Sequence, residues 1–440
     1  MKTLSLCMIV RNEAEMLPGF LSACKGLYDE LCVVDTGSTD DTLRILAEAG
    51  AKVTTSKWEE DFAAARNRSL AMATGSHILI LDADEMVSEE FVAEMRGLIE
   101  RPDVGAACVN MVNALPHGHR SRSVLLRMFL NEPGIVYRHP IHEDASPSVS
   151  DMLRRVDKAL ATMKSDVYHH GYGAKRAQER DKKVRDTTIL WRCVEANPHD
   201  LYSWYKLLEQ GRFWADPMLT EQAAQGALSA VEQLEAVPQA SQHFLGDMVV
   251  LLVTALRESD QDRAAALLHT WCERLPDDAA ITLYRGQWRE ELGALDLARM
   301  DFLHCLQLRS YTPNLQLTSV RPRLGLARVA MARGDNSQAL DHAESALLSQ
   351  PRDPEALLAI ASLARLLGGA TAAQRMAQAY IETYGECAEL HAAFGEAALM
   401  DNAPNEAVRN LEVACATSER PEDYSALLER ARTASEFTLL

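Results

Sequence analysis

Two aspartates separated by one residue, Asp82 and Asp84, are the side chains of this sequence best placed to do chemistry. They follow the apolar run 77–81, which predicts a strand buried on both faces. Side chains two apart on a strand point the same way, so both carboxylates can converge on one point. Such a pair either shares a proton or holds a hard cation through oxygen. We expect the cation, although acids after a strand can also simply begin a helix, as residues 88–90 would allow.

Composition limits the classes of function. The 440 residues carry 63 acidic and 45 basic side chains, a formal net charge of -18, which on average repels nucleic acid and anionic lipid. An anionic substrate must therefore be held by local donors or by a metal. The nine cysteines form no C-x-x-C pair, so neither a disulfide framework nor a thiolate zinc site is indicated. No run approaches the roughly 20 apolar residues of a membrane span and no leader pattern opens the chain, so we expect a cytoplasmic protein without a transmembrane segment.

Strands and helices alternate through the first half of the sequence. Expected strands cover residues 4–10, 31–34, 52–55, 77–81, 104–112 and 124–129, and expected helices cover residues 17–24, 43–47, 61–74 and 88–98. This alternation predicts a mainly parallel sheet with helices on both faces, whose ligands bind at the carboxyl ends of the strands. Polar clusters at residues 11–13, 35–38 and 82–85 each follow a strand. Neither G-x-G-x-x-G after the first strand nor a P-loop is present, so a dinucleotide fold or a P-loop site is not supported.

Four motifs occur in a fixed order: S-L-C-M-I-V-R-N-E at 5–13, V-V-D-T-G-S-T-D at 33–40, W-E-E-D-F-A-A-A-R-N at 58–67 and L-D-A-D-E at 81–85. In order and spacing they closely resemble family 2 glycosyltransferases with the α/β GT-A fold. The chain looks most like members joined to tetratricopeptide repeats, a group that includes bacterial peptide S-glycosyltransferases and relatives of lipopolysaccharide-core glucosyltransferases. The resemblance is dense from residue 4 to 90 and thinner to about residue 172.

The resemblance implies a role for each motif. Residues that would hold the nucleotide base and ribose are Val10, Arg11, Asn12, Glu13, Asp35 and Gly37. Arg66 would lie against the base or the phosphates, and Asp82 with Ala83 would reach the ribose or the water shell of a metal. Asp84 would bind Mn²⁺ or Mg²⁺ bridging the diphosphate. The chemistry agrees, because either ion prefers oxygen ligands and can neutralise a diphosphate leaving group without many basic side chains nearby.

Two clusters with histidine follow, at residues 137–144 and 167–172. The first resembles the V-H-E motif of the family, and within it Glu143 is the predicted general base, with Asp144 and His142 as the alternatives. The second resembles H-x-G-Y, which implies that His169, or its neighbour His170, contacts the metal or the diphosphate. The family pattern R-L-F-R-N stands here as R-M-F-L-N at 127–131, so any role of its second arginine cannot be transferred. A zinc site that uses His139 and His142 is disfavoured, since Pro140 makes this segment a loop.

The second half of the sequence reads as helices with a period of 34 residues. Residues that are small except for Tyr380 recur at that spacing in three series: Ala327, Ala361 and Gly395; Ala339, Ala373 and Ala407; and Ala346, Tyr380 and Ala414. A period of 34 residues is that of the tetratricopeptide repeat. We therefore expect a GT-A domain at residues 1–173, linking helices at 174–240 and an all-α array of tetratricopeptide-like repeats at 241–440. Every candidate catalytic residue precedes residue 173, so the chain from about residue 197 should be separable from the chemistry.

The expected function is a metal-dependent inverting glycosyltransferase that moves a hexose from a nucleotide sugar, UDP-linked in our expectation, to a peptide or protein. One alternative changes the acceptor to the lipopolysaccharide core or another surface saccharide. An alternative of another class is a scaffold in which a degenerate GT-A domain only binds nucleotide sugar. The repeats would bind the acceptor or join two copies in a homodimer, and no nucleic acid partner is expected.

Overall fold

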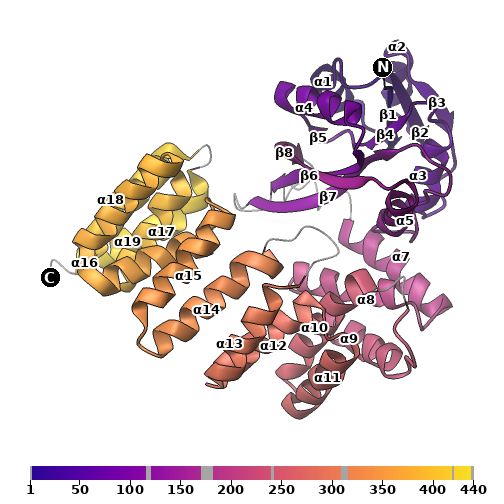
Figure 1. The fold of residues 1–440 in the computed structure, drawn as a ribbon. Coiled ribbons are helices and arrows are strands. Elements are labelled where there is room, and N and C mark those ends of the chain that lie inside the picture. The colour runs from indigo at the N-terminus through magenta and orange to yellow at the C-terminus, as the bar shows by residue number, and fades with distance from the viewer. Residues whose placement is uncertain are drawn as a thin grey trace. The chain divides into compact units, whose positions relative to one another are not determined.

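The computed structural model describes residues 2–114, 120–169, 182–238, 242–308, 316–418 and 421–437. It divides into two compact units, Met1–Ser241 and Gln242–Leu440, which Figure 1 draws in indigo to pink and in red to yellow. The candidate residue His170 and the expected boundary at residue 173 lie outside the described residues.

The first unit is built on one eight-stranded sheet with the strand order β3-β2-β1-β4-β7-β6-β8-β5. Strands β1, β2, β3 and β4 run parallel, β7 is antiparallel to β4, and β6 is antiparallel to β7. Strand β8 runs parallel to β6, and the short β5 pairs with β8 in the antiparallel direction. The strands are β1 Leu4–Val10, β2 Glu30–Asp35, β3 Lys52–Thr55, β4 His77–Ile80, β5 Glu85–Met86, β6 Val104–Ala114, β7 Arg120–Leu130 and β8 Ala159–His169. The expected parallel sheet is therefore confirmed for the first four strands.

Helices cover both faces of this sheet (Figure 1). Alternate residues of a strand point to opposite faces, so Leu6 and Met8 of β1 enter one apolar core and Cys7 enters the other. The first core receives Phe20 of α1 and Phe91 of α4. The helices of this unit are α1 Leu17–Ala23, α2 Thr42–Glu48, α3 Phe62–Leu70, α4 Glu89–Glu100, α5 Ser146–Val156, α7 Lys182–Ala196, α8 Leu201–Phe213 and α9 Pro217–Glu232. The result is a three-layer α/β domain followed by three further helices.

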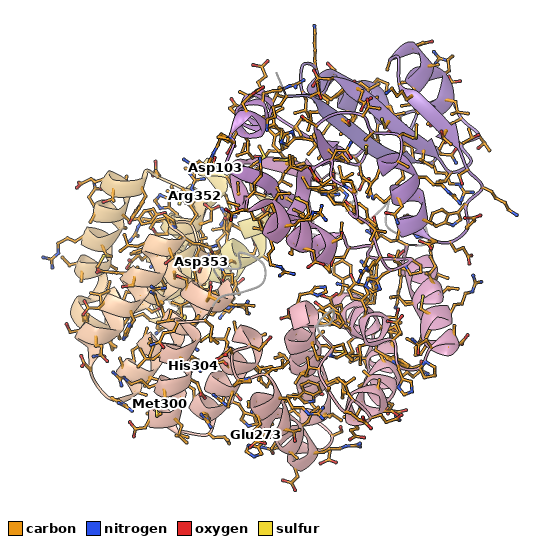
Figure 2. The ribbon with its side chains drawn as sticks, turned by 45° about the vertical axis from the view of Figure 1, so that its right-hand side comes forward. Asp103, Glu273, Met300, His304, Arg352 and Asp353 are labelled. Carbon is orange, nitrogen blue, oxygen red and sulfur yellow. The ribbon has the colours of Figure 1, made fainter. Side chains whose placement is uncertain are left out.

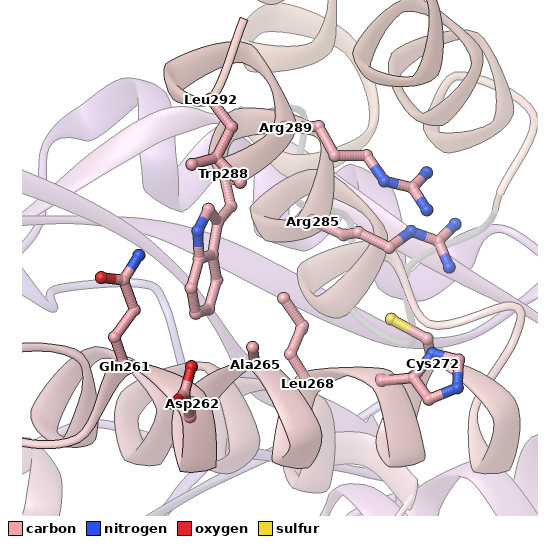
Figure 3. Close-up of a pocket in the computed structure, with 10 residues that line it drawn as sticks. Gln261, Asp262, Ala265, Leu268, Cys272, Arg285, Trp288, Arg289 and Leu292 are labelled. Carbon is pink, nitrogen blue, oxygen red and sulfur yellow. The ribbon is translucent and has the colours of Figure 1, made fainter. Parts of the chain in front are cut away.

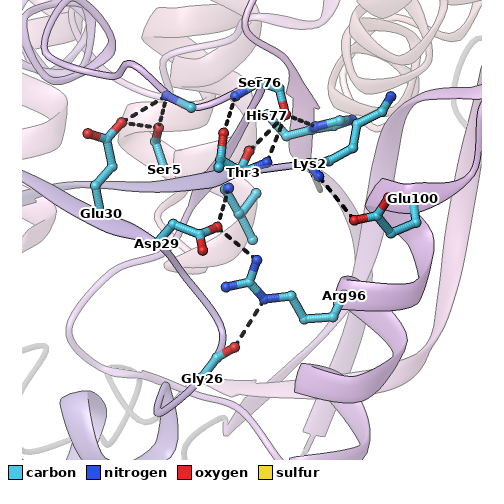
Figure 4. Close-up of polar contacts among 12 residues, drawn as sticks. Lys2, Thr3, Ser5, Gly26, Asp29, Glu30, Ser76, His77, Arg96 and Glu100 are labelled. Atoms are coloured by element: carbon cyan, nitrogen blue, oxygen red, sulfur yellow. Dashed lines mark hydrogen bonds and ion pairs between the residues drawn. The ribbon is translucent and has the colours of Figure 1, made fainter.

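The amino ends of the parallel strands are tied together by polar contacts (Figure 4). The Leu4 amide donates to Asp29 Oδ2 at 2.8 Å, and Arg96 reaches the same carboxylate oxygen at 2.8 Å. The Gly75 amide donates to Ser5 Oγ at 2.9 Å, and a Cβ on residue 75 would meet that oxygen at 2.6 Å. This end of the sheet is therefore fixed by structural contacts, whereas the polar motifs lie at the carboxyl ends.

The second unit is an array of antiparallel helices in which α14 packs against α15 and α17 against α18. Its helices are α10 Gln242–Arg257, α11 Gln261–Arg274, α12 Ala279–Glu291, α13 Leu295–Cys305, α14 Arg321–Ala332, α15 Asn336–Ser349, α16 Pro354–Tyr384, α17 Ala388–Met400, α18 Pro404–Thr417 and α19 Glu422–Phe437, with a short π-helical turn η3 at Gln316–Val320. The small residues of the 34-residue series are buried where helices meet: a Cβ on Gly395 would come within 2.7 Å of Leu411. The expected helical repeat array is confirmed.

Helix α16 is two helices joined by a kink. Its backbone leaves the helical conformation at Gly368 and Gly369, so it corresponds to one antiparallel pair of the array. By length and composition alone it is also the one helix of the described residues that is apolar enough to cross a membrane. Asp353, labelled in Figure 2, caps its first turn by accepting from the Ala356 amide at 2.9 Å, and its other oxygen accepts from Gln316 Nε2 at 2.6 Å.

Candidate active site

The ends of β1 and β2 lie side by side, with Val10 opposite Asp35 in the parallel register. The Asp35 side chain is buried, and its Oδ1 accepts hydrogen bonds from the Gly37 and Ser38 amides at 2.9 and 3.0 Å. Its Oδ2 is also buried and has no hydrogen-bond partner among the described residues. Buried carboxylate oxygens are almost always paired, so this one is suited to accept from a ligand.

Two loops at this edge are joined through Asn12. Asn12 has a φ of 56°, a left-handed conformation that asparagine tolerates better than most residues. Its backbone amide donates to Ser38 Oγ at 2.9 Å, and its Oδ1 accepts from the Thr39 amide at 2.8 Å. The Glu13 amide donates to Thr42 Oγ1 at 2.8 Å, while the Arg11 side chain is exposed. The residues expected to hold a nucleotide are therefore close to Asp35.

Arg66 of α3 joins two carboxylates that are far apart in the sequence. Its Nη2 lies 2.9 Å from Asp82 Oδ1, and its Nε donates to Glu143 Oε1 at 2.9 Å. Arg66 is only 5% exposed, and its Nη1 has no hydrogen-bond partner in the described part of the chain. Burial works to raise the pKa of Asp82, but the charges of Arg66 and Arg127 outweigh it and hold that pKa at about 2. The structure thus brings three predicted site residues into one ionised cluster.

The turn that contains Asp82 and Asp84 is held by a second ion pair that the sequence reasoning missed. Glu85 Oε2 accepts from the Asp82 amide at 2.9 Å, and the Glu85 amide donates back to the Asp82 carbonyl at 3.0 Å. Glu85 Oε1 is paired with Arg127 of β7. Burial raises the pKa of Glu85 to about 7, against the attraction of Arg127 and with the repulsion of Asp82. Two features of the sequence could have pointed to this pair. One is the third acid, Glu85, beside the two aspartates, and the other is Arg127, which stands at the first arginine of the family pattern R-L-F-R-N.

Asp84 and His169 meet at the same edge. Glu85 of β5 is opposite His169 of β8 in the sheet, and this register brings Asp84 Oδ2 within 3.3 Å of His169 Nε2. The carboxylate oxygen suits Mn²⁺ or Mg²⁺, whereas an imidazole nitrogen is a ligand for transition metals, so the donor set fits Mn²⁺ better than Mg²⁺. No group of three or more such ligands occurs among the described residues, because Asp82 is turned to Arg66. The remaining ligands of an ion would therefore come from substrate and water.

The three predicted catalytic residues have different surroundings. Only Glu143 contacts the Arg66 cluster. Asp144 Oδ1 accepts from the Ser146 amide at 2.8 Å, at the start of α5. His142 Nε2 lies 3.1 Å from Gln210 Nε2, and burial, aided by nearby cations, lowers the pKa of His142 to about 3. A base this weak accepts protons poorly near neutral pH, so the geometry favours Glu143.

The second unit contains a groove between α11 and α12 (Figure 3). It has a volume of about 310 Å³, and Trp288, Arg285 and Arg289 are among its lining residues. Both guanidinium groups pair with the buried Asp301 at 2.7 Å, so this one carboxylate balances one of their two charges. Its lining also includes Asp262 and His269, but no group of three or more possible metal ligands occurs there among the described residues.

Comparison with known proteins agrees with this geometry. Residues 5–160 match the family model described as Glycosyl transferase family 2. A TPR repeat-containing protein of Synechococcus elongatus is 39% identical over 209 residues, which cover 47% of this chain and 52% of that protein. The SPbeta prophage-derived glycosyltransferase SunS of Bacillus subtilis is 25% identical over 203 residues, covering 45% of this chain and 46% of SunS. The chain thus spans about half the length of these curated relatives.

Among solved structures, glucosyl-3-phosphoglycerate synthase from Mycobacterium tuberculosis, in complex with phosphoglyceric acid, is 20% identical and has a TM-score of 0.33. The match covers 44% of this chain and 80% of that one, a likeness too low to support a conclusion. The family match and the geometry of the motifs identify the first unit. The 34-residue series and the paired helices identify the second. Residues 5–160 therefore form a domain that matches the glycosyl transferase family 2 model, and helical repeats of the tetratricopeptide type follow it in the chain.

Proposed function

We propose that this protein is a metal-dependent, inverting glycosyltransferase that moves a hexose from a UDP-linked sugar to a peptide or protein acceptor. The observation that carries the proposal is that Asp84, which pairs with His169, lies on the same turn as Asp82, which is joined through Arg66 to Glu143. Both aspartates belong to the domain that matches family 2. The Asp84 and His169 pair is suited to the leaving diphosphate, and the cluster that contains Glu143 is suited to the acceptor.

Asp35 supports uracil as the base. Its unpartnered, buried Oδ2 needs a hydrogen-bond donor. Uracil presents a ring N–H at its N3 position, whereas the corresponding ring nitrogens of cytosine and adenine are acceptors. A guanine ring also offers an N–H, so GDP-linked sugars are the competing donors that an experiment must include.

The Asp84 and His169 pair would hold a Mn²⁺ or Mg²⁺ ion together with oxygens of the donor diphosphate. When bound, such an ion stabilises the negative charge that develops on the leaving diphosphate. This contribution matters in a chain of net charge -18, where the two arginines nearest the site already pair with carboxylates.

Glu143 would take the proton of the acceptor nucleophile as that atom attacks the anomeric carbon from the face opposite the nucleotide. The bond between the anomeric carbon and the diphosphate oxygen breaks, and the nucleoside diphosphate leaves. Arg66 holds Glu143 through Nε and Asp82 through Nη2, so its role in the proposal is to fix the carboxylate and not to abstract the proton. Asp82 remains an anion because its pKa is about 2.

The repeats support a polypeptide acceptor, because an array of paired helices provides an extended surface for binding. The same surface could instead join two copies of the chain. All nine cysteines are free thiols, which supports a reducing compartment such as the cytoplasm.

A panel of nucleotide sugars tests the proposal. The wild-type protein should hydrolyse UDP-hexoses slowly in the presence of Mn²⁺, and faster consumption should follow addition of the peptide acceptor. Omitting the metal should abolish both. Hydrolysis of GDP sugars alone would contradict uracil as the base, and transfer to a saccharide alone would contradict the peptide acceptor. Absence of nucleotide binding would favour the scaffold alternative.

A further inference from the structure

Glu143 lies in a loop whose two ends are joined by backbone hydrogen bonds and whose interior contains two residues with a strained backbone. Arg138 and Asp144 exchange two backbone hydrogen bonds, at 3.0 and 3.1 Å. Between them His139 and His142 have φ values of 71° and 53°, in the left-handed region that residues other than glycine rarely adopt. Such conformations persist only where the surrounding structure holds them. A loop of this kind needs contacts from outside to keep one conformation.

Tyr202 of α8 supplies two of these contacts. Its hydroxyl donates to the His142 carbonyl oxygen at 2.5 Å. Its ring stacks on the ring of His139, with 3.7 Å between the centroids and 17° between the planes. The His142 carbonyl belongs to the peptide group that joins His142 to Glu143. The hydroxyl of Tyr202 therefore fixes the orientation of the peptide immediately before the candidate base.

Gln210, two turns further along α8, holds the other side of the same residue. Trp214 Nε1 donates to Gln210 Oε1 at 2.7 Å, which leaves the amide nitrogen of Gln210 facing His142 Nε2 at 3.1 Å. That ring nitrogen must accept the bond, so His142 is neutral with its proton on Nδ1. The lowered pKa of His142 agrees with this state.

The loop also touches the helix that carries Arg66. The Pro140 carbonyl accepts from the Phe62 amide at 2.7 Å, at the first residue of α3. Arg185 of α7 lies over the Phe62 ring, 5.1 Å from its centroid. Helices α7 and α8 thus contact both segments whose side chains form the ion pair between Arg66 and Glu143.

We propose that Tyr202 is a positioning residue for the transfer step, acting through the peptide group before Glu143. The inference rests on the proposed function, in which Glu143 is the base. Tyr202 contacts the loop from the side of α8, through the His142 carbonyl oxygen and the His139 ring. Its loss should therefore affect the chemical step and spare donor binding.

Tyr202→Phe keeps the stacked ring and removes only the hydroxyl. Loss of one buried hydrogen bond should lower kcat for transfer roughly five- to tenfold while the donor KM stays within about twofold. Tyr205→Phe is the matched control: Tyr205 is a buried tyrosine of the same helix whose hydroxyl donates to Glu209 Oε1 of that helix at 2.9 Å. It should keep wild-type kcat.

A double-mutant cycle separates positioning from general damage. In a Glu143→Gln background, Tyr202→Phe should cause no further loss of transfer, because the group it positions is already gone. An equal fold-loss in both backgrounds, a matching rise in donor KM, or the same kcat for Tyr202→Phe and Tyr205→Phe would overturn the proposal.

Amide hydrogen exchange tests the inference without turnover. Exchange at residues 141–144 should be faster in Tyr202→Phe than in Tyr205→Phe, with the strands unchanged. Equal exchange in the two variants would overturn the positioning role. If wild type shows no transfer to any acceptor but the loop exchange responds as expected, the proposed function fails and the contact from α8 stands.

Discussion

Helices α7–α9 and helices α10–α19 both follow the last strand of the sheet, yet their side chains have different partners. Tyr202 and Gln210 of α8 contact the loop that carries Glu143. In the second unit, by contrast, several ion pairs join one repeat helix to another, as Arg328 of α14 does with Glu290 of α12 and Arg365 of α16 with Glu406 of α18. The change from strands to helices in the sequence therefore does not mark where the candidate active site ends. The extent of the site is instead defined by contacts between residues that are far apart in the sequence.

The largest effect should come from Glu143→Gln, which tests whether the loop contacted by α8 carries the catalytic base. Transfer should fall about 10²- to 10⁴-fold, because a general base typically contributes that factor. Donor affinity, measured by titration calorimetry with UDP and Mn²⁺, should remain close to wild type. Asp144→Asn is the neighbouring control and should transfer normally. Near-normal turnover in Glu143→Gln would move the base to Asp144 or another group.

Asp84→Asn should weaken UDP binding in the presence of Mn²⁺ by roughly 10- to 100-fold. The fold should persist, since the carboxylate lies at a strand end with 15% of its side chain exposed. Nucleotide binding without metal should be the same in both proteins. Equal affinities with and without metal, in wild type and variant alike, would exclude a metal held by Asp84.

Asp301→Asn tests the repeat array. The variant would leave Arg285 and Arg289 without their shared buried partner, and we expect the unfolding free energy of the second unit to fall by about 2 kcal/mol, less than for a fully buried pair because both arginines are partly exposed. Donor hydrolysis below the unfolding temperature should be unchanged. Asp277→Asn, at an exposed site of the same unit, should unfold like wild type. Lost hydrolysis in a folded Asp301→Asn protein would mean that the array takes part in the active site.

The smallest effect should be a pH dependence of the stability of the first unit. Burial, with the nearby charges of Lys2 and Lys158, lowers the pKa of His77 to about 4. The unfolded chain, with a histidine pKa near 6.5, therefore binds more protons between these values, and stability should be lost as pH falls through this window. His77→Leu should flatten that loss in denaturant unfolding, although His142 contributes in the same direction. The exposed His269→Gln should leave the slope unchanged, and an unaltered slope in His77→Leu would contradict the assignment.

The sequence predicted the elements that have local signals. Strands β1 and β3 have the expected bounds, and the 34-residue series appear as paired helices. The sequence also indicated Arg66, Asp82 and Glu143, each from a separate motif. The structure joins these three side chains in one cluster. Their roles remain predictions. Helix α5 and strand β8 were not anticipated, because their burial depends on neighbours distant in the chain. The contacts of Glu85 with Arg127 and of Tyr202 with His142 span 42 and 60 residues, and no local pattern indicates such pairs.

The kink in α16 determines how far the segment Pro354–Tyr384 extends. Thirty-one residues of continuous α-helix would extend about 46 Å as a straight apolar rod. Gly369, at φ 64° and ψ -159°, has a backbone conformation open in practice to glycine alone, and it folds the segment into a hairpin. An alanine pair at residues 368 and 369 would favour the rod, so the antiparallel pair within α16 would be lost and every helix after it would be displaced.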